Sequence, residues 1–146
     1  MGEVAMCEEI TQAQQELVSE FGLFDDWMGR YEYLIDLGRH LPEFPSEWKT
    51  AENKIHGCQS QVWLRTQMQN GRLHIDGTSD AAIVSGLIAV LLRVFSDRKP
   101  EDVLVTKPDF IASIGFDQHL SPTRSNGLHA MLEAIYQRAR EAAGSH

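Results

Sequence analysis

An Asn-Gly pair at residues 70–71 separates two segments in which apolar and polar residues alternate, and this pattern predicts a β-hairpin. Both central residues of a type I′ turn need a positive φ, which Asn and Gly adopt more readily than other residues. A two-residue turn also sets the register of the strands. It pairs Met68 with Leu73, Thr66 with Ile75, and Arg65 with Asp76. The apolar faces of the strands then coincide, and we expect Arg65 and Asp76 to form a cross-strand ion pair.

Segments with helical periodicity precede the hairpin. We expect one helix to begin at the capping box of Thr11 and to end at Gly22. A second helix is expected from Asp25 or Asp26, whose charges suit a helix N-terminus, to a point before Pro42. Residues 45–53 should form a loop.

Further helical segments follow the hairpin. Ser79 is the expected N-cap of a helix with Asp80 in its first turn. That helix is apolar on almost all sides over residues 81–92, so it should be the buried centre of the domain. The spacing of the apolar residues over 110–114 predicts one or two helical turns. A last helix is expected over residues 122–142.

The expected fold class is therefore α+β, with N-terminal helices, a small antiparallel sheet formed by the hairpin, and C-terminal helices packed on it. A length of 146 residues accommodates one compact domain, and no repeat or linker divides it. We expect a single domain over residues 1–146. Residues 143–146 are set apart as a disordered tail or an added remnant.

Acidic residues are concentrated in the first third of the chain. The formal net charge is −8, and residues 1–46 hold ten acidic and two basic residues, so the remainder is neutral. Such a surface disfavours binding to nucleic acid, which requires Lys and Arg to displace counterions. A solvated helix face explains the acidic excess more simply than a basic partner does.

The sequence also bears on the cellular compartment. The longest apolar stretch, residues 81–92, spans twelve residues and is too short to cross a bilayer, and the acidic N-terminal region is unlike a targeting signal. We expect a cytoplasmic protein with reduced thiols and no membrane contact. Two cysteines cannot form a disulfide-rich scaffold or a four-cysteine zinc site.

Cys58 is the strongest candidate for a reactive residue, because it lies in a Gly-Cys-Gln-Ser segment just before the first predicted strand. Glycine permits a tight turn with an exposed tip there. A thiol reacts as the thiolate, so its pKa of about 8.5 must be lowered or its partner must be strongly electrophilic. An inert cysteine that fills space in the core is an equally good interpretation of the spacing. Cys7 precedes the first expected helix, on a mobile arm, and we treat it as incidental.

A metal site is a weaker interpretation of the same region. His56 and Cys58 flank one glycine, while His119 and His129 are distant in the sequence. Zinc requires three or four converging ligands, and an iron–sulfur scaffold requires several thiolates. We therefore expect no metal site.

Residues 121–127 combine a helix N-terminus with a positive charge. Ser121 and Pro122 are typical of the N-cap and first position of a helix, and Arg124 lies in its first turn. A cation there opposes the helix dipole, so Arg124 does not stabilise the helix. The segment suits an anion such as a thiolate, a persulfide or a carboxylate. A surface ion pair with an acidic residue explains Arg124 equally well.

Four segments of the chain together carry a resemblance to a known family. They are Tyr33-Leu34-Ile35-Asp36-Leu37-Gly38 with Leu41-Pro42, Gly57-Cys58-Gln59-Ser60-Gln61-Val62-Trp63, Gly77-Thr78-Ser79-Asp80-Ala81-Ala82-Ile83, and Leu120-Ser121-Pro122-Thr123-Arg124-Ser125-Asn126-Gly127-Leu128. In sequence and order these segments resemble the SufE family of sulfur-acceptor proteins across nearly the whole chain, which is more specific than a cysteine turn alone. His56 departs from the family, in which Gln is familiar, and His129 lies where variation is common.

The resemblance implies a protein that takes sulfur from a pyridoxal-phosphate cysteine desulfurase of the SufS or CsdA type. It would pass the sulfur to an iron–sulfur scaffold or another acceptor, and stimulate the desulfurase. The family's acceptor cysteine falls on Cys58, which would become a persulfide. The pyridoxal phosphate belongs to the partner, so we expect no cofactor in this chain. Such a protein is an acceptor and activator rather than a stand-alone enzyme, and we expect a monomer.

Cys58 is thus the expected nucleophile, and six residues are expected to support it. These are Gly57, Gln59, Ser60, Ser79, Asp80 and Arg124. We expect Arg124 to stabilise the loop or the sulfur anion, and Ser79 and Asp80 to hold the resting loop in place. Two alternatives stay open: a thiol redox protein with a single reactive cysteine, and a desulfurase-binding regulator in a sulfur pathway that does not build clusters.

Overall fold

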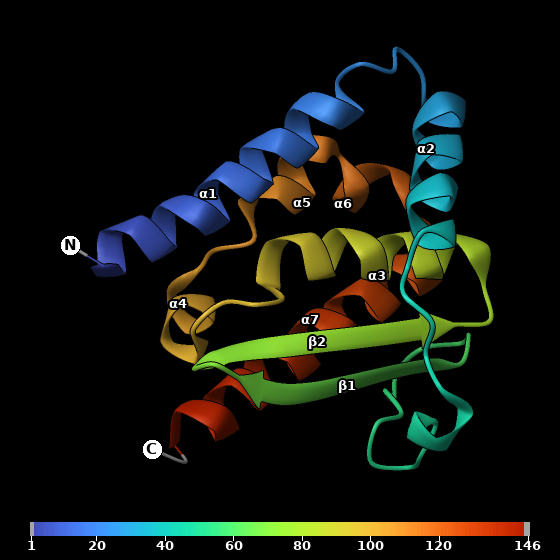
Figure 1. Cartoon of the computed structure of the whole chain (residues 1–146). Coiled ribbons are helices and arrows are strands. Elements are labelled where there is room, and N and C mark those ends of the chain that lie inside the picture. The colour runs from blue at the N-terminus through green and yellow to red at the C-terminus, as the bar shows by residue number, and fades with distance from the viewer. Residues whose placement is uncertain (1, 145–146) are drawn as a thin grey trace.

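The computed structural model describes residues 2–144, with side chains from residue 8 onward. Helices precede and follow a two-stranded antiparallel sheet, which confirms the α+β class (Figure 1). The elements are α1 (Gly2–Phe21), α2 (Trp27–Arg39), a 3-10 turn (Ser46–Trp48), β1 (Val62–Gln69), β2 (Arg72–Ser79), α3 (Ala82–Phe95), α4 (Pro100–Val105), α5 (Asp109–Ile114), α6 (Phe116–His119) and α7 (Pro122–Gly144).

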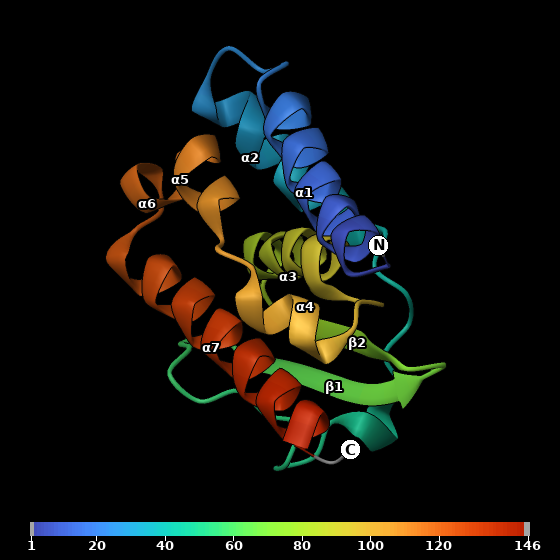
Figure 2. The ribbon, with the colours of Figure 1, turned by 90° about the vertical axis from the view of Figure 1, so that its left-hand side faces the viewer.

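Helix α3 lies at the centre of the molecule, as its apolar sequence predicts. The hairpin covers one side of it, α1 and α2 cover the opposite side, and α7 runs along a third (Figures 1 and 2). Seven of its residues are buried: Gly86, Leu87, Ile88, Val90, Leu91, Val94 and Phe95. An α-helix that is apolar on nearly all sides is stable in water only when other elements surround it.

Two glycines allow α2 and α3 to cross at close range. A Cβ on Gly86 would lie 2.2 Å from the carbonyl oxygen of Leu34, and a Cβ on Gly38 would lie 2.6 Å from the amide nitrogen of Gly86. Side-chain atoms do not fit at such distances, so backbone meets backbone at this crossing. The position of α2 against the core therefore depends on these two glycines.

The hairpin has the predicted turn and the predicted register. Asn70 and Gly71 have φ values of 54° and 79°, as a type I′ turn requires. All three predicted pairings are confirmed: Met68 with Leu73, Thr66 with Ile75, and Arg65 with Asp76.

The predicted ion pair between Arg65 and Asp76 is wrong, although the two residues lie opposite each other. The Arg65 guanidinium instead lies over the Trp48 ring, 4.1 Å from its centroid. Asp76 approaches the imidazole of His74 at 3.5 Å. A cation on an aromatic face gains both burial and electrostatic attraction, and the sequence pattern of the strands gave no sign of Trp48.

Of the two N-terminal helices, α2 begins where the sequence predicts and α1 does not. Helix α1 begins at Gly2, so the predicted start at Thr11 is wrong, because residues 3–10 contain no glycine or proline that would stop the helix. Cys7 consequently falls within α1 rather than on a mobile arm, and its side chain lies outside the described residues. Asp26 caps α2 as predicted, with its side chain accepting from the Gly29 N–H at 2.8 Å.

The start of α3 differs from the prediction, whereas the start of α7 agrees with it. Helix α3 begins at Ala82, so Ser79 is not its cap and Asp80 is not in its first turn. Ser79 pairs with Val62 instead, because the strand ladder continues to that point. Helix α7 begins at Pro122 and extends to Gly144, so residues 143–144 belong to the fold, while Ser145 and His146 lie outside the described residues.

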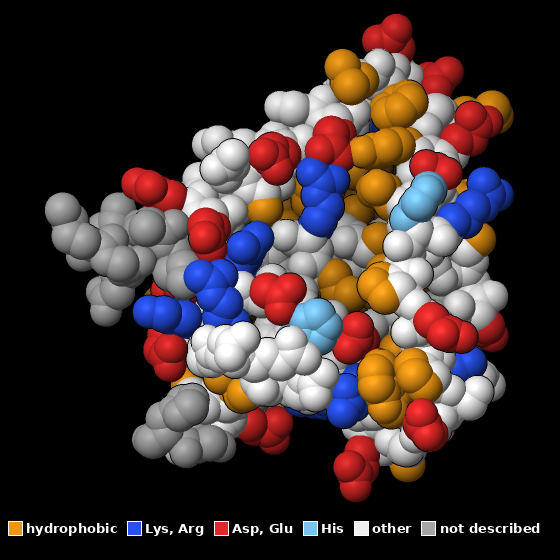
Figure 3. All heavy atoms as spheres, viewed as in Figure 1, with side chains coloured by type: hydrophobic (Ala, Val, Ile, Leu, Met, Phe, Trp, Pro, Cys, Tyr) orange, Lys and Arg blue, Asp and Glu red, His pale blue; other side chains and the backbone are white. Residues whose placement is uncertain are grey.

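Most acidic residues of the N-terminal third are exposed, among the side chains that the structure describes. Figure 3 shows acidic side chains along the edge formed by α1 and α2. Glu20 is the partly buried exception: Arg93 of α3 donates to it at 2.6 Å, and the hydroxyl of Tyr33 on α2 also donates to it. Chiefly through the Arg93 hydrogen bond, the pKa of Glu20 is lowered. None of the helices in residues 2–144 combines the length and apolarity needed to cross a membrane.

His74 links β2 to the turn that follows α3. Its Nδ1 lies 2.7 Å from Asp97 Oδ1, and its Nε2 lies 3.5 Å from Asp76 Oδ2. The hydrogen bond to Asp97, reinforced by the charge of Asp76, raises the pKa of His74 against the opposing effect of burial.

Replacing His74 by Gln should therefore destabilise the protein more at about pH 5.5 than at about pH 8. A raised folded-state pKa means that the charged pairs stabilise the fold fully below the ordinary histidine value of 6.5 and lose this effect as the pH rises through the folded-state value. The Asp97 side chain is 59% exposed to solvent, which weakens the charged pair. We therefore expect the destabilisation at the two pH values to differ by less than about 1 kcal/mol. Urea unfolding at both pH values measures the difference. Gln67→Ala, directly opposite His74, is the non-titrating control. Equal destabilisation by His74→Gln at both pH values would contradict the prediction.

Candidate functional site

Residues 56–61 form a short loop in front of β1, and this loop carries Cys58. Its two ends are held together, because the Ile55 N–H donates to the Val62 carbonyl at 2.9 Å. Gly57 has a φ of 93°, a left-handed conformation that would strain any residue with a side chain. The predicted tight turn at this glycine is therefore confirmed, although Cys58 itself is half-buried rather than exposed.

Asp80 anchors the end of this loop to the end of β2. Its Oδ1 accepts from the Gln61 N–H at 3.0 Å, and its own N–H donates to the Gln61 carbonyl at 3.4 Å. Ser79 acts one residue earlier, where its hydroxyl oxygen accepts from the Ala81 N–H at 3.2 Å. Asp80 thus fixes the loop directly, and Ser79 shapes the turn that leads into α3.

The Cys58 side chain is half-buried and faces α7. Its Sγ lies 3.8 Å from the Gly127 carbonyl oxygen, toward which the thiol donates a weak hydrogen bond. Beside it lies a hollow of about 660 Å³ between the loop, α2 and the first turns of α3 and α7. The lining residues are Ile35, Cys58, Gln59, Ser60, Ala81, Ala82, Ile83, Val84, Leu87, Ser121, Thr123, Arg124, Gly127, Leu128 and Met131.

Burial raises the pKa of the Cys58 thiol above its ordinary value. An apolar environment disfavours the thiolate, so the resting side chain is mostly the protonated thiol at neutral pH. Of the two conditions for reactivity set out from the sequence, a lowered pKa is not met. The remaining one is a strongly electrophilic reaction partner.

Arg124 lies at the rim of the hollow, in the first turn of α7. Its backbone N–H donates to the Ser121 hydroxyl oxygen at 3.3 Å, so the predicted cap of α7 is confirmed. Its side chain is exposed and, among the described residues, forms no ion pair with a carboxylate. The surface ion pair considered from the sequence is thus not formed.

The hollow brings together Cys58, Gln59, Ser60 and Arg124, which the sequence analysis had singled out. Gly57, Ser79 and Asp80 act on the backbone around it instead. The apolar side chains of α2, α3 and α7 that line the Cys58 hollow were not predicted as site residues. Helical periodicity identifies them as core residues, but only the tertiary arrangement shows that they meet at Cys58. These are Ile35, Ile83, Val84, Leu87, Leu128 and Met131.

Two of the three histidines considered as metal ligands have other contacts. His119 stacks on Trp27 with ring centroids 4.2 Å apart, and His129 lies 3.7 Å from Asp117. In the part of the chain that the structure describes, no three His, Cys, Asp or Glu side chains converge as a metal site.

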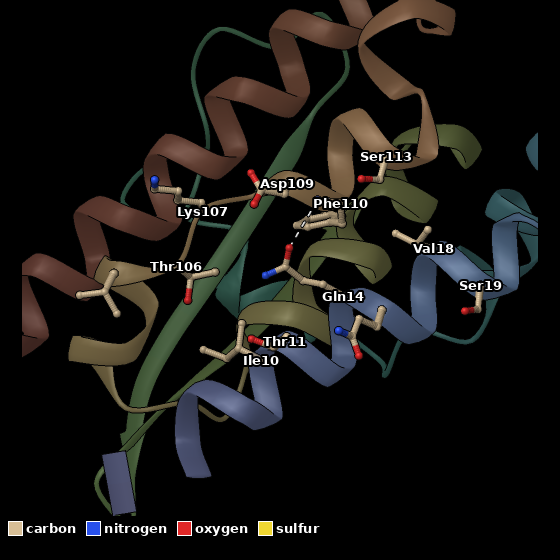
Figure 4. Close-up of a pocket in the computed structure, with 12 residues that line it drawn as sticks. Ile10, Thr11, Gln14, Val18, Ser19, Thr106, Lys107, Asp109, Phe110 and Ser113 are labelled. Carbon is tan, nitrogen blue, oxygen red and sulfur yellow. Dashed lines mark hydrogen bonds between the residues drawn. The ribbon is translucent and has the colours of Figure 1, made fainter. Parts of the chain in front are cut away.

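A second hollow, of about 580 Å³, lies between α1 and the α4–α5 segment (Figure 4). Gln14 crosses it, and its side-chain oxygen accepts from the Phe110 N–H at 3.4 Å. The wall consists of apolar, hydroxyl and amide groups with Lys107 and Asp109, and it shares no residue with the Cys58 hollow. Within the side chains described from residue 8 onward, no cysteine lines this second hollow, whereas the first borders the thiol of Cys58.

The fold and site define a small α+β domain that presents one glycine-flanked thiol between a loop and two helices. A protein-family model for SufE, described as an Fe-S metabolism associated domain, matches residues 15–139. The chain therefore belongs to the SufE family, and this membership supports a role in iron–sulfur metabolism.

Similar proteins agree with this assignment. An uncharacterized SufE-like protein of Rhizobium meliloti is 40% identical over 129 residues, covering 85% of this chain and 92% of the relative. Another, from Rhizobium etli, is 38% identical over 135 residues, covering 89% and 91%. The solution structure of a hypothetical protein from Thermus thermophilus has the same fold, with a TM-score of 0.75, 20% identity, and coverage of 90% of this chain and 96% of that one.

Replacing Asp80 by Ala should loosen the Cys58 loop. Losing the hydrogen bond to Gln61, at about 1 kcal/mol, should speed alkylation of Cys58 by iodoacetamide about fivefold. Chains that also carry Cys7→Ser have Cys58 as their single thiol and give a clean rate. Asp80→Asn keeps a side-chain oxygen and should react like the parent. Equal alkylation rates for Asp80→Ala and the parent would show that Asp80 does not hold the loop.

Proposed function

We propose that Cys58 accepts sulfur from the active-site persulfide of a pyridoxal-phosphate cysteine desulfurase and passes it on for iron–sulfur cluster assembly. The observation that carries this proposal is the placement of Cys58. Its thiol lies on a glycine turn that is closed at both ends, beside a hollow large enough for additional sulfur. Membership of the SufE family supports the same reaction class.

The transfer is a thiol–persulfide exchange. The Cys58 thiol gives up its proton, and the resulting thiolate attacks the outer sulfur of the desulfurase persulfide. A new S–S bond forms on Cys58 as the donor S–S bond breaks, and the donor cysteine leaves as a thiolate. No external oxidant or reductant is needed.

The raised pKa of Cys58 fits a carrier that must stay unreactive between encounters. Few thiolates are present at rest, so oxidants and stray electrophiles meet a protonated, half-buried thiol. A docked desulfurase supplies both the electrophilic persulfide and a changed environment for the thiol. The pyridoxal phosphate stays on the desulfurase, and this chain contributes the acceptor thiol alone.

Arg124 is proposed to stabilise the sulfur anion of the loaded carrier. Arg124 is one of the residues that line the Cys58 hollow, and its guanidinium is not engaged by a carboxylate of the described residues. Arg124 also lies at the N-terminal end of α7, where the helix dipole favours negative charge.

The remaining parts of the proposal concern the cellular setting. The partners are a SufS- or CsdA-type desulfurase, which the protein stimulates, and a downstream scaffold or other sulfur acceptor. The protein acts as a cytoplasmic monomer. Its exposed acidic N-terminal third would steer it toward a basic surface on the desulfurase.

Cys58→Ser should abolish sulfur uptake without unfolding the protein. Incubation with a desulfurase and cysteine, followed by intact-mass spectrometry, detects the added sulfur atom. Cys7→Ser is the matched control and should accept sulfur normally. Sulfur on the Cys58→Ser protein would refute the acceptor role. Full desulfurase stimulation by that variant would instead indicate a regulator, and sulfenate trapped on wild-type Cys58 in place of persulfide would indicate a redox protein.

Arg124→Ala should slow sulfur transfer to Cys58 by about tenfold, the effect of losing one charge-assisted contact of about 1.4 kcal/mol in the loaded state. Single-turnover transfer from a persulfide-loaded desulfurase measures this rate. Arg140→Ala, which removes an exposed arginine near the other end of α7, is the matched control. A transfer rate unaffected by Arg124→Ala would remove Arg124 from the site.

A further inference from the structure

Gly127 occupies a position where helix stability favours another residue. It lies within α7, is buried, and has no positive φ that would require glycine. Glycine in a helix interior costs about 0.5–1 kcal/mol relative to alanine. Its presence therefore calls for a packing reason.

The resting structure supplies no such reason at Gly127, although it does at three other glycines inside helices. A Cβ would lie 2.6 Å from backbone at Gly38, 2.2 Å from backbone at Gly86, and 3.1 Å from the Asp26 side chain at Gly29. At Gly127 it would meet only Cys58 Sγ, at 3.6 Å, which is ordinary van der Waals contact. A methyl group is thus compatible with the thiol and faces the sulfur atom of Cys58 alone.

We infer that Gly127 reserves space for the outer sulfur atom of a Cys58 persulfide. This inference rests on the proposed function of Cys58 as a sulfur acceptor. An S–S bond of about 2.05 Å extends the side chain by one atom beyond Sγ. With glycine at position 127, no side chain stands between Sγ and the backbone of α7, and the inference places the outer sulfur atom on that side.

Alanine at position 127 would fill this space. Its Cβ, 3.6 Å from Sγ, would collide with a further sulfur atom placed on that side. The outer sulfur would then have to point away from α7, toward the open side of the hollow, where thiols in solution reach it. Gly127 is in this sense a positioning residue, because it determines where the transferred sulfur lies. The position of the unloaded Cys58 thiol does not depend on it.

The test compares Gly127→Ala with the parent in chains that carry Cys7→Ser. Asn126→Ala, at the exposed neighbouring position, controls for a gain in helix propensity. Each protein is loaded by two routes. In the first, a desulfurase and cysteine supply the sulfur. In the second, Cys58 is converted to a mixed disulfide with an aryl thiol, and hydrosulfide then displaces the aryl thiolate, so that the Cys58 persulfide forms as the aryl S–S bond breaks.

Loss of the added sulfur to a small thiol, followed by mass spectrometry, should be severalfold faster in Gly127→Ala than in the parent or Asn126→Ala. The unloaded Gly127→Ala protein should be alkylated at the parent rate and have a Tm no lower than the parent. Equal rates of sulfur loss, or a lowered Tm of the unloaded variant, would overturn the inference. A parent that accepts sulfur only by the chemical route would refute the proposed function and still test Gly127. A parent that holds sulfur by neither route refutes both.

Discussion

The burial of α3 is the constraint on which the rest of the structure depends. A helix that is apolar on nearly all sides must be covered all round, and the hairpin, α1, α2 and α7 provide that cover (Figure 2). The glycine crossing at Gly38 and Gly86 brings α2 so close that Ile35 reaches the first turns of α3. The Cys58 hollow is therefore the place where the covering elements meet at one end of the central helix.

The sequence contains enough local information to predict most of the fold. The hairpin register follows from a two-residue turn and a side-chain period of two, and both rules act over a few residues. The buried centre follows from the uniform apolarity of α3. Local rules failed where two of them competed. Ser79 has the chemistry of a helix cap, but strand pairing with Val62 holds it in β2.

The site was only partly predictable for a related reason. The thiol, the glycine beside it and the cap of α7 are each evident within a few residues of sequence. Contacts between distant segments are not. Arg65 stacks on the ring of Trp48 instead of pairing with Asp76. The Cys58 thiol donates to the carbonyl of Gly127 in α7, sixty-nine residues away along the chain. The raised pKa of Cys58 comes from that packing, so no motif around the cysteine could have indicated it.

The Cys58 thiol is half-buried, and the hydrogen bonds of its loop indicate what exposing it requires. Among those described, the bonds that tie residues 56–61 to the rest of the chain are the thiol contact with Gly127 and the pair between Gln61 and Asp80. The junction of Ile55 with Val62 lies outside the loop and can stay closed. Breaking the bonds of the loop therefore leaves the ladder of β1 and β2 intact. Because a net hydrogen bond contributes about 1 kcal/mol, the rearrangement costs far less than unfolding. The fold can thus keep the Cys58 thiol sheltered at rest and still expose it.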